Sequence, residues 1–152
     1  MAVQVNGLAE AIAHLEAVQA RSRDLTPVLS VAAADTVALI DDAFETGISP
    51  NGSPFAALAE STQARRRRGR GTGENKILVD TGRLRGSFNA TGEARALKFG
   101  TNVGYAMFHQ TGTRRMPARP PMPISGQPGA FVLSNSGAAA AHWARVRESV
   151  VR

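Results

Sequence analysis

Three histidines are the residues of this chain best suited to acid–base or metal chemistry: His14, His109 and His142. No two of them have the short spacing of a metal-ligand pair. The chain has no cysteine, which excludes a thiolate metal site, a cysteine nucleophile and a disulfide. His14 and His142 lie within helical patterns, where we expect surface or boundary side chains. The sequence therefore predicts no metal site.

His109 stands beside Gln110 and is the histidine of greatest interest. A general acid or base at this position needs a carboxylate or hydroxyl partner. Asp80, Ser87 and Thr111 carry such groups, but no recognised spacing links them to His109. We expect the ring to be structural, either bonded to backbone groups or placed at an interface. We therefore predict no catalytic residue.

Two further patterns superficially resemble ligand sites. Asp41, Asp42 and Glu45 form an acidic patch, but adjacent residues of a helix point in different directions. We expect a solvated face or a contact between subunits there. The glycine-rich segment 69–73 lacks the preceding strand and the Gly-Lys-Ser/Thr ending of a phosphate-binding loop. We therefore predict no cofactor.

One segment accounts for the positive charge of the chain. The formal net charge is +6, and residues 61–85 hold eight Lys and Arg residues against two acidic ones. Such a run can contact phosphates without sequence preference, but it lacks the interleaved aromatic residues that stack on bases. A solvated mobile loop, or a loop that becomes ordered on an acidic protein partner, is favoured over non-specific contact with nucleic acid. The run consists of Arg65, Arg66, Arg67, Arg68 and Arg70.

Two short blocks are typical of a surface that fits another protein. The first is Leu-Val-Asp-Thr-Gly-Arg-Leu-Arg-Gly-Ser-Phe over residues 78–88. The second is Tyr-Ala-Met-Phe-His-Gln-Thr-Gly-Thr over residues 105–113, and an Ala-Arg-Pro step at 118–120 follows it. Both blocks mix apolar anchors and turn glycines with arginines or other polar groups. This composition indicates assembly rather than catalysis.

Two helices must position the start of the chain. The first is predicted from about residue 8 to 22, and the second from the N-cap Thr26, with Pro27 in its first turn, to Gly47. Each helix has one apolar stripe, which we expect to pack inside the domain. The stripes consist of Leu8, Ile12, Leu15 and Val18 in the first helix and of Ala33, Val37, Ile40 and Phe44 in the second.

The remaining elements are short. Turn residues predict a loop over 49–54, and repulsion between like charges predicts a mobile loop over 65–74. The two blocks themselves contain a helical turn capped by Asp80 or Thr81 and a helix over 105–110 ending at Gly112. Also expected are a strand over 76–79, a hairpin around 91–93, an extended segment over 116–128 with five prolines, a strand over 131–133 and a helix over 138–146.

The totals indicate one globular domain. The chain has 152 residues, of which 43% are hydrophobic, 20% charged and only 5% aromatic. A core of small side chains buries little area per residue, so association with other subunits is a plausible source of further burial. We predict an α+β fold with two N-terminal helices packed on a small, mostly antiparallel sheet, a mobile basic loop and a proline-rich arm. The parts are a helical part (1–47), a loop with the basic run (48–75), a sheet and motif region (76–134) and a C-terminal helix (135–152).

No segment suggests a membrane or an export signal. No apolar run approaches the roughly 20 residues that span a bilayer. The first residues lack the basic and apolar regions of a signal peptide. We expect no membrane association, and we expect the protein to stay in the cytoplasm where it is made or to enter an assembly built there.

Four stretches in this order resemble the phage virion morphogenesis family, the tail-completion proteins of Mu-like and P2-like phages. The likeness covers about residues 41–133. Phe55, Thr111 and Pro121 depart from it, because the family tends to have Trp, an aromatic residue and Phe at these places. The stretches are Phe44 with the turn at 50–55, Ser61-Thr62 with the basic run, 78–87, and 100–110 closed by 116–120.

The resemblance implies a non-enzymatic protein that forms a ring, with six subunits favoured, and helps a finished tail join a filled head. Tail-tube and neck or connector proteins would be its partners. It would be located at the neck or tail end of the virion, and in the host bacterial cytoplasm during assembly. The candidate contact residues with a subunit or partner are Arg83, Arg85, Tyr105, Phe108, His109 and Arg119.

Residue chemistry is compatible with these roles. Arg83 and Arg85 suit bidentate contacts with carboxylates of a neighbouring subunit. Tyr105 and Phe108 supply amphipathic contact area, and the proline-fixed segment after Arg119 loses little entropy on docking. Two other classes remain open at this point. One is a nucleic-acid-binding protein that uses the arginine run, and the other is a small hydrolase that uses His109.

Overall fold

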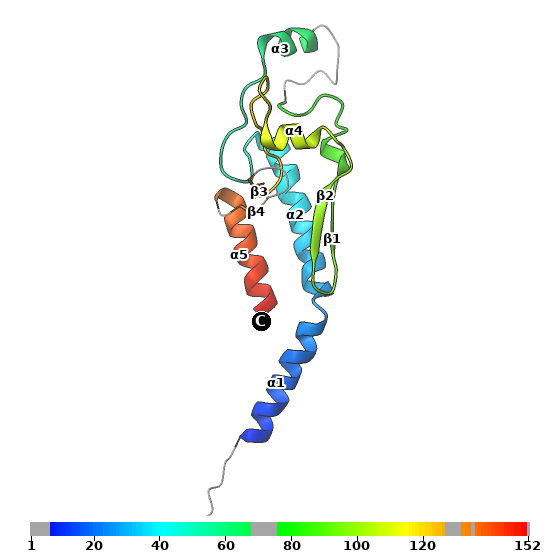
Figure 1. Ribbon diagram of the computed structural model, residues 1–152, viewed down its shortest axis with the longest axis vertical. Helices are drawn as coiled ribbons and strands as arrows, with labels where there is room; N and C mark the ends of the chain where they lie inside the picture. The colour runs from blue at the N-terminus through cyan, green and yellow to red at the C-terminus, as the bar shows by residue number, and fades with distance from the viewer. Residues whose placement is uncertain (1–6, 68–75, 127–131, 135, 152) are drawn as a thin grey trace, which may run out of the picture.

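The protein is elongated, with one long helix at its centre. The computed structural model describes residues 7–67, 76–126, 132–134 and 136–151. Five helices and two small antiparallel sheets give an α+β fold, as predicted (Figure 1). The elements are α1 (Leu8–Arg23), α2 (Thr26–Thr46), α3 (Glu60–Arg67), η1 (Arg85–Ser87), β1 (Phe88–Gly92), β2 (Leu97–Thr101), α4 (Ala106–Thr111), β3 (Ile124–Ser125), β4 (Val132–Leu133) and α5 (Gly137–Val151).

The central helix α2 begins and ends close to its predicted limits. Thr26, the predicted N-cap, is instead the first helical residue, and its N–H donates to Asp24 Oδ1 at 2.9 Å. Gly47 ends the helix in the left-handed region at φ 71°, and its N–H donates to the Ala43 carbonyl. Ile40 and Phe44 are each only 1% exposed, so the predicted apolar face of α2 is the centre of the core.

The β1–β2 hairpin packs directly on α2. The strands pair antiparallel, with Phe88 opposite Thr101 and Gly92 opposite Leu97, which confirms the predicted hairpin. A Cβ on Gly92 would lie 2.2 Å from the Leu29 carbonyl carbon, so only glycine lets the strand approach the helix backbone this closely. At the other end of β1, the rings of Phe88 and Phe44 lie 5.8 Å apart.

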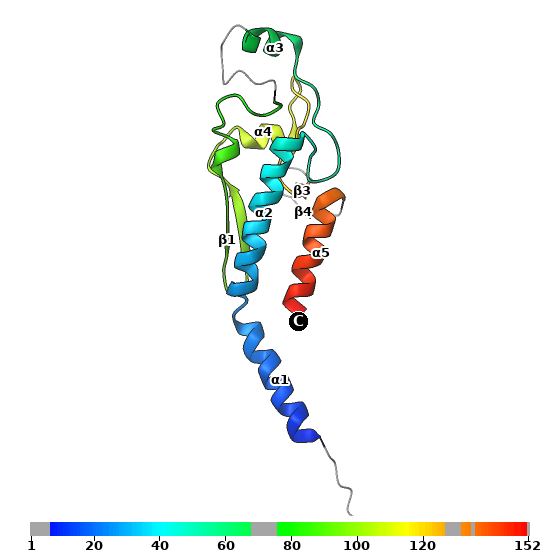
Figure 2. The same ribbon diagram turned by 180° about the vertical axis from the view of Figure 1, so that it is seen from behind.

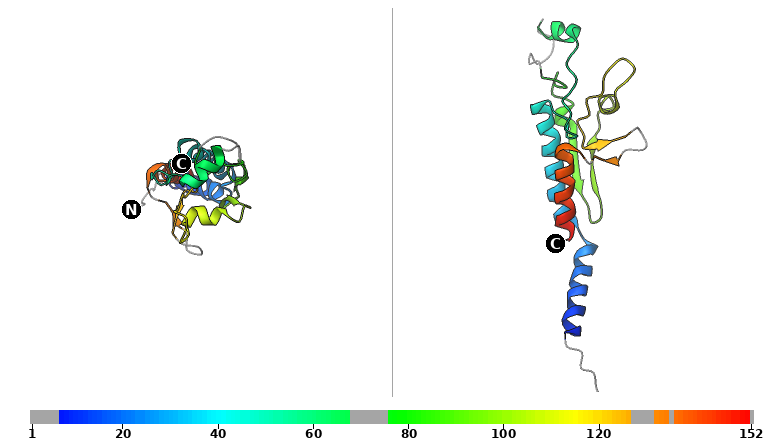
Figure 3. Two further views of the ribbon diagram at one scale, coloured as in Figure 1. Left: turned by 90° about the horizontal axis from the view of Figure 1, so that it is seen from above. Right: turned by 90° about the vertical axis from the view of Figure 1, so that its left-hand side faces the viewer.

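The helix α5 packs against α2 beside the hairpin, and the ring of Trp143 lies 5.9 Å from that of Phe99 in β2 (Figure 2; Figure 3, right). Trp143 is 4% exposed, and its indole N–H donates to the Pro123 carbonyl at 3.3 Å. His142 is 1% exposed, so the prediction of a surface or boundary residue is wrong. Its burial is possible because Nε2 lies 2.9 Å from Thr36 Oγ1. The Thr36 hydroxyl donates to the Ala32 carbonyl and can therefore accept a hydrogen bond from the ring.

The first helix does not pack on the rest of the protein as expected. Ile12, Leu15 and Val18 are 48%, 66% and 46% exposed, so the predicted apolar stripe faces solvent. Figure 1 shows α1 leading away from the base of α2. The link between them is held in place, because the Leu25 N–H donates to the Ala94 carbonyl in the turn of the hairpin.

Three predictions in the middle of the chain need correction. Residues 65–67, expected in a mobile loop, lie in α3, while residues 68–75 lie outside the described part. Residues 76–79 form turns instead of a strand, with Leu78 in the left-handed region at φ 64°. The Lys76 carbonyl accepts a hydrogen bond from the Arg66 side chain in place of a neighbouring strand. The helical turn expected after Asp80 comes later, as η1.

The C-terminal predictions agree with the structure. The helix α4 ends at Gly112, whose N–H donates to the Phe108 carbonyl. The short strands β3 and β4 pair antiparallel, which confirms a strand at residues 132 and 133, while Phe131 lies outside the described part. None of the helices in the described ranges is long and apolar enough to cross a membrane.

We predict that Gly92→Ala lowers the free energy of unfolding by about 2 kcal/mol or more, because the new methyl group forces β1 away from α2. Urea denaturation followed by circular dichroism measures this. Gly100→Ala in β2 is the matched control, since a Cβ there meets nothing within 4 Å, and its effect should stay within about 0.5 kcal/mol. Equal stability of the two variants would contradict the role given to Gly92.

We also predict that the protein loses stability as the pH falls from 7.5 to 5.5. Burial, and then the charge of Arg145, lower the pKa of His142 below its usual value of about 6.5. Below that pH the unfolded chain takes up a proton that the folded ring resists, so protonation favours unfolding. The contribution of one histidine to the slope is at most about 1.4 kcal/mol per pH unit.

His142→Gln removes the titrating ring and can still donate to Thr36, so its stability should depend less on pH than that of the parent protein. The comparison isolates His142, because His109, whose pKa is also lowered, is present in both proteins. Urea denaturation at several pH values provides the two slopes. If the two slopes coincide, the buried ring of His142 is not the source of the pH dependence of stability.

Candidate functional site

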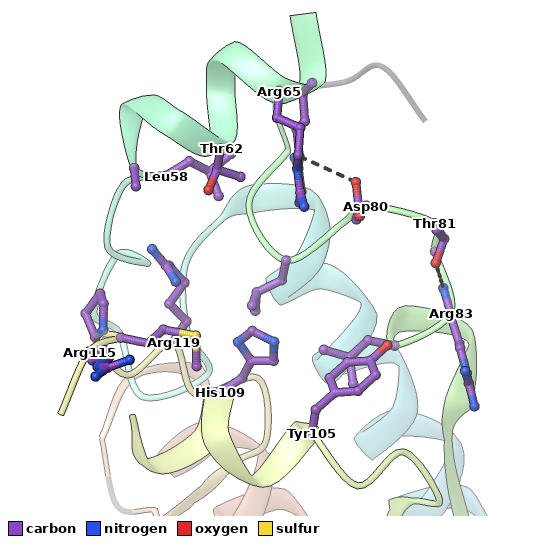
Figure 4. A pocket seen from close by; sticks show the side chains of 17 residues that line it. Leu58, Thr62, Arg65, Asp80, Thr81, Arg83, Tyr105, His109, Arg115 and Arg119 are labelled. Carbon is purple, nitrogen blue, oxygen red and sulfur yellow. Dashed lines mark hydrogen bonds and ion pairs between the residues drawn. The ribbon is translucent and has the colours of Figure 1, made fainter. Parts of the chain in front are cut away.

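A pocket of about 500 Å³ lies where four separate segments of the chain meet. Its walls come from residues 58–66 at and before α3, the turn at 78–84, the helix α4 and the segment 115–119 (Figure 4). Both sequence blocks reach it, and so does Arg119 of the Ala-Arg-Pro step. The fold thus brings together three stretches that the sequence shows only as separate motifs.

The lining of the pocket is strongly basic. It includes the arginines at positions 65, 66, 83, 115 and 119, whereas Asp80 is the one carboxylate among the lining residues. Apolar side chains, among them Leu58, Leu84 and Met116, make up other parts of the wall. A positive site with apolar walls attracts anions more strongly than an open basic surface, because water screens the charges less.

Two of the arginines hold the walls together. Arg119 is 7% exposed, and it donates from Nε to the Ala56 carbonyl and from Nη2 to the Ala57 carbonyl, both at 2.7 Å. Arg66 is 6% exposed, and it donates to the Lys76 carbonyl at 2.8 Å and lies 3.7 Å from Asp80. These contacts join segments that lie far apart in the sequence and fix the shape of the pocket.

The other three arginines are exposed. In Figure 4, Arg115 and Arg83 stand on opposite sides of the pocket, and Arg65 comes from α3 above it. Within the described residues, none of these three guanidinium groups has a hydrogen-bond or ion-pair partner. They are therefore available to a ligand. Of the predicted arginine run, only residues 65 and 66 can be placed at the site, since 68 and 70 lie outside the described part.

His109 projects from α4 into the pocket (Figure 4). Its ring meets Tyr105 edge to face, with centroids 6.0 Å apart, and its buried Nδ1 has no hydrogen-bond partner among the described residues. Burial, and then the charge of Arg119, lower the pKa of His109, so the ring is neutral near pH 7. No carboxylate orients it as in a catalytic dyad. The described residues also contain no group of three or more His, Asp or Glu side chains that could hold a metal ion.

Arg85, predicted as a contact with a neighbouring subunit, is engaged within its own chain. It binds Asp41 through two hydrogen bonds of 2.6 and 2.8 Å, and it also binds Glu45. Lys76 binds Glu45 at 2.7 Å. Asp41 and Glu45 lie four residues apart on one face of α2, so a single guanidinium reaches both. These hydrogen bonds lower the pKa of both carboxyl groups.

Exposed apolar side chains border the pocket on α4. Tyr105, Met107 and Phe108 are 41%, 41% and 53% exposed. The opposite face of the helix is fixed by Gln110, whose side chain donates to the Ile124 carbonyl at 2.8 Å and accepts the Met122 N–H at 3.2 Å. The helix thus presents its aromatic side chains outward from a rigid support.

Sequence reasoning missed some residues of the site. Arg115 and Met116 were not singled out, although they follow the second block directly in a turn closed by a bridge between Thr113 and Met116. Leu58 was not predicted at a site and Thr62 was noted only as part of a family stretch, since their position depends on how α3 sits above the pocket. Arg119 was predicted as a contact residue, but its side chain is used inside the protein.

The fold and the pocket together define a small α+β protein with a basic pocket bordered by exposed aromatic side chains. The sequence model of the phage virion morphogenesis family matches residues 4–139 of the 152, and the chain belongs to this family. The resemblance drawn from the four sequence stretches is confirmed, and it assigns the protein to phage morphogenesis. Comparisons with curated proteins and with solved structures gave no match.

We predict that Arg119→Met lowers the free energy of unfolding by about 2 kcal/mol, because two charge-assisted hydrogen bonds to main-chain carbonyls are lost. Urea denaturation measures the change, and limited proteolysis should cut the segment around residues 56–57 faster. Arg115→Met, in the same segment but exposed, should change stability by less than about 0.5 kcal/mol. Unchanged stability of Arg119→Met would show that the hydrogen bonds from Arg119 to residues 56 and 57 do not stabilise the fold.

Proposed function

We propose that this protein is a structural component that completes the phage tail and joins it to the head, acting as a ring at the tail end. The observation that carries the proposal is the convergence of three of the family's four sequence stretches on one basic pocket with an aromatic border. These stretches build a surface for contact, and no oriented acid–base pair is found among the described residues there. We therefore propose a non-enzymatic role.

A closed ring needs two different surfaces on each subunit that fit each other. The exposed stripe of α1 is one candidate. The second is an apolar groove of about 400 Å³ between α2 and α5, lined by Val28, Ala32 and Val146 and by Val31, which is 64% exposed. Because α1 leads away from the base of α2, we propose that it lies in the groove of the next subunit. The family resemblance favours six subunits.

The surface around the pocket would then face the other components of the particle. We propose tail-tube and neck or connector proteins as these partners, with Arg83, Tyr105 and Phe108 in the contact. The protein would be made in the bacterial cytoplasm and become part of the neck or tail end of the virion. Arg66, counted in the sequence as a nucleic-acid contact, instead holds a wall of the pocket, which weakens that alternative.

The experiment is negative-stain imaging of purified protein mixed with tails that lack it, together with sedimentation analysis of the mixture. The parent protein should form a ring at the tail end and restore joining to heads. Leu15→Asp places a charge in the α1 stripe and should abolish ring formation. Ala17→Asp, on the opposite face of the same helix, is the matched control and should assemble normally.

Two results would contradict the proposal. If the parent protein never orders on tails and does not restore joining, the assignment to tail completion is wrong. If Leu15→Asp and Ala17→Asp assemble equally well, the ring does not use the α1 stripe. Circular dichroism should show that both variants remain folded, because α1 does not contribute to the core.

A further inference from the structure

We propose that the basic pocket binds an acidic segment of another protein of the particle, whose carboxylates pair with Arg65, Arg83 and Arg115. This inference rests on the proposed function, because it names the chemistry of a partner in the assembly. It also makes the pocket, rather than the whole basic surface, the place of recognition.

The charge of the pocket favours an anionic ligand. Five guanidinium groups face one carboxylate, Asp80, which lies 3.7 Å from Arg66. Arg119 donates its hydrogen bonds to two neutral carbonyls, so no opposite charge cancels its own. The three exposed arginines have no partner within the described residues. A guanidinium in this state binds a carboxylate with two parallel hydrogen bonds.

The shape of the pocket favours a protein segment over a nucleic acid. A hollow of about 500 Å³ accepts a few side chains, whereas the phosphates of a duplex lie on its convex outer surface. Leu58, Leu84 and Met116 in the wall suit an apolar side chain between the acidic ones.

A second copy of this chain is a poor occupant. The chain carries a formal net charge of +6, so two copies repel each other around this site. Several of its carboxylates are already paired within the chain: Asp41 and Glu45 with Arg85, and Glu93 with Lys98. An acidic segment from a different protein satisfies the pocket without breaking these pairs.

The test measures binding of fluorescein-labelled octaglutamate to the full-length protein by fluorescence anisotropy at physiological salt. The pocket variant is Arg65→Gln, Arg83→Gln and Arg115→Gln combined. The control combines Arg23→Gln, Arg95→Gln and Arg147→Gln, which are exposed, lie outside the pocket and remove the same charge. The pocket variant should bind at least about tenfold more weakly, and the control less than about twofold. All six side chains are exposed, so both variants should keep the parent melting temperature.

Other outcomes would overturn the inference. Equal weakening in both variants would show general attraction to a basic protein. If the parent protein does not bind octaglutamate but binds a labelled DNA duplex through the same three arginines, the pocket is a nucleic-acid site. Imaging with tails distinguishes failure of this inference from failure of the proposed function. If rings form on tails but octaglutamate does not bind, only the inference about the pocket is wrong. If octaglutamate binds through the pocket but no ring forms on tails, only the tail-completion role is wrong.

Discussion

The close packing of strand β1 on helix α2 is the constraint on which the rest of the structure depends. At one end of the strand, Gly92 lets the two backbones touch, and at the other end Phe88 packs against Phe44. These two contacts align the hairpin along the helix. The segments before β1 and after β2 therefore emerge together at one end of α2, where Leu84 and Ala106 join the core and the pocket forms.

Arginine serves two purposes at this end of the protein. A buried guanidinium must find hydrogen-bond acceptors, because its desolvation is otherwise too costly. Arg66 and Arg119 meet this demand by binding main-chain carbonyls, Arg66 ten positions away and Arg119 at 63 and 62 positions. Arg65, Arg83 and Arg115 remain exposed and keep their charge available. A pocket built on buried arginines is therefore rigid and positive at once.

The helix α1 exposes apolar side chains that the fold of a single chain does not bury. It has 16 residues, close to the length of about 12–15 residues below which an isolated helix is marginal in water. Its apolar stripe is exposed, whereas helices of globular proteins gain most of their stability by burying such a face. With aromatic residues making up only 5% of the chain, the core buries little area per residue, and the proposed packing of α1 on the next subunit would bury more.

Local patterns alone were enough for several elements. The helix from residue 26 to Gly47, the hairpin, the short helix ending at Gly112 and the closing helix follow from apolar spacing and from turn and cap residues, which act over a few neighbours. Local patterns gave a wrong prediction at residues 76–79. Their apolar run predicts a strand, but no strand in the described part of the chain pairs with them. Local patterns also failed for His142, since only the partner Thr36 makes its burial tolerable.

By itself, the sequence determined the α+β class, the family and most of the segments that line the pocket. Only the tertiary structure decided the role of each arginine. The groups that surround a guanidinium determine whether it forms structural hydrogen bonds within the chain or stays exposed and available to a ligand. Arg85 and Arg119 were both predicted to bind a neighbour, and both bind their own chain. The pocket itself joins residues up to 61 positions apart, from Leu58 to Arg119, and such proximity is set by packing rather than by spacing along the chain.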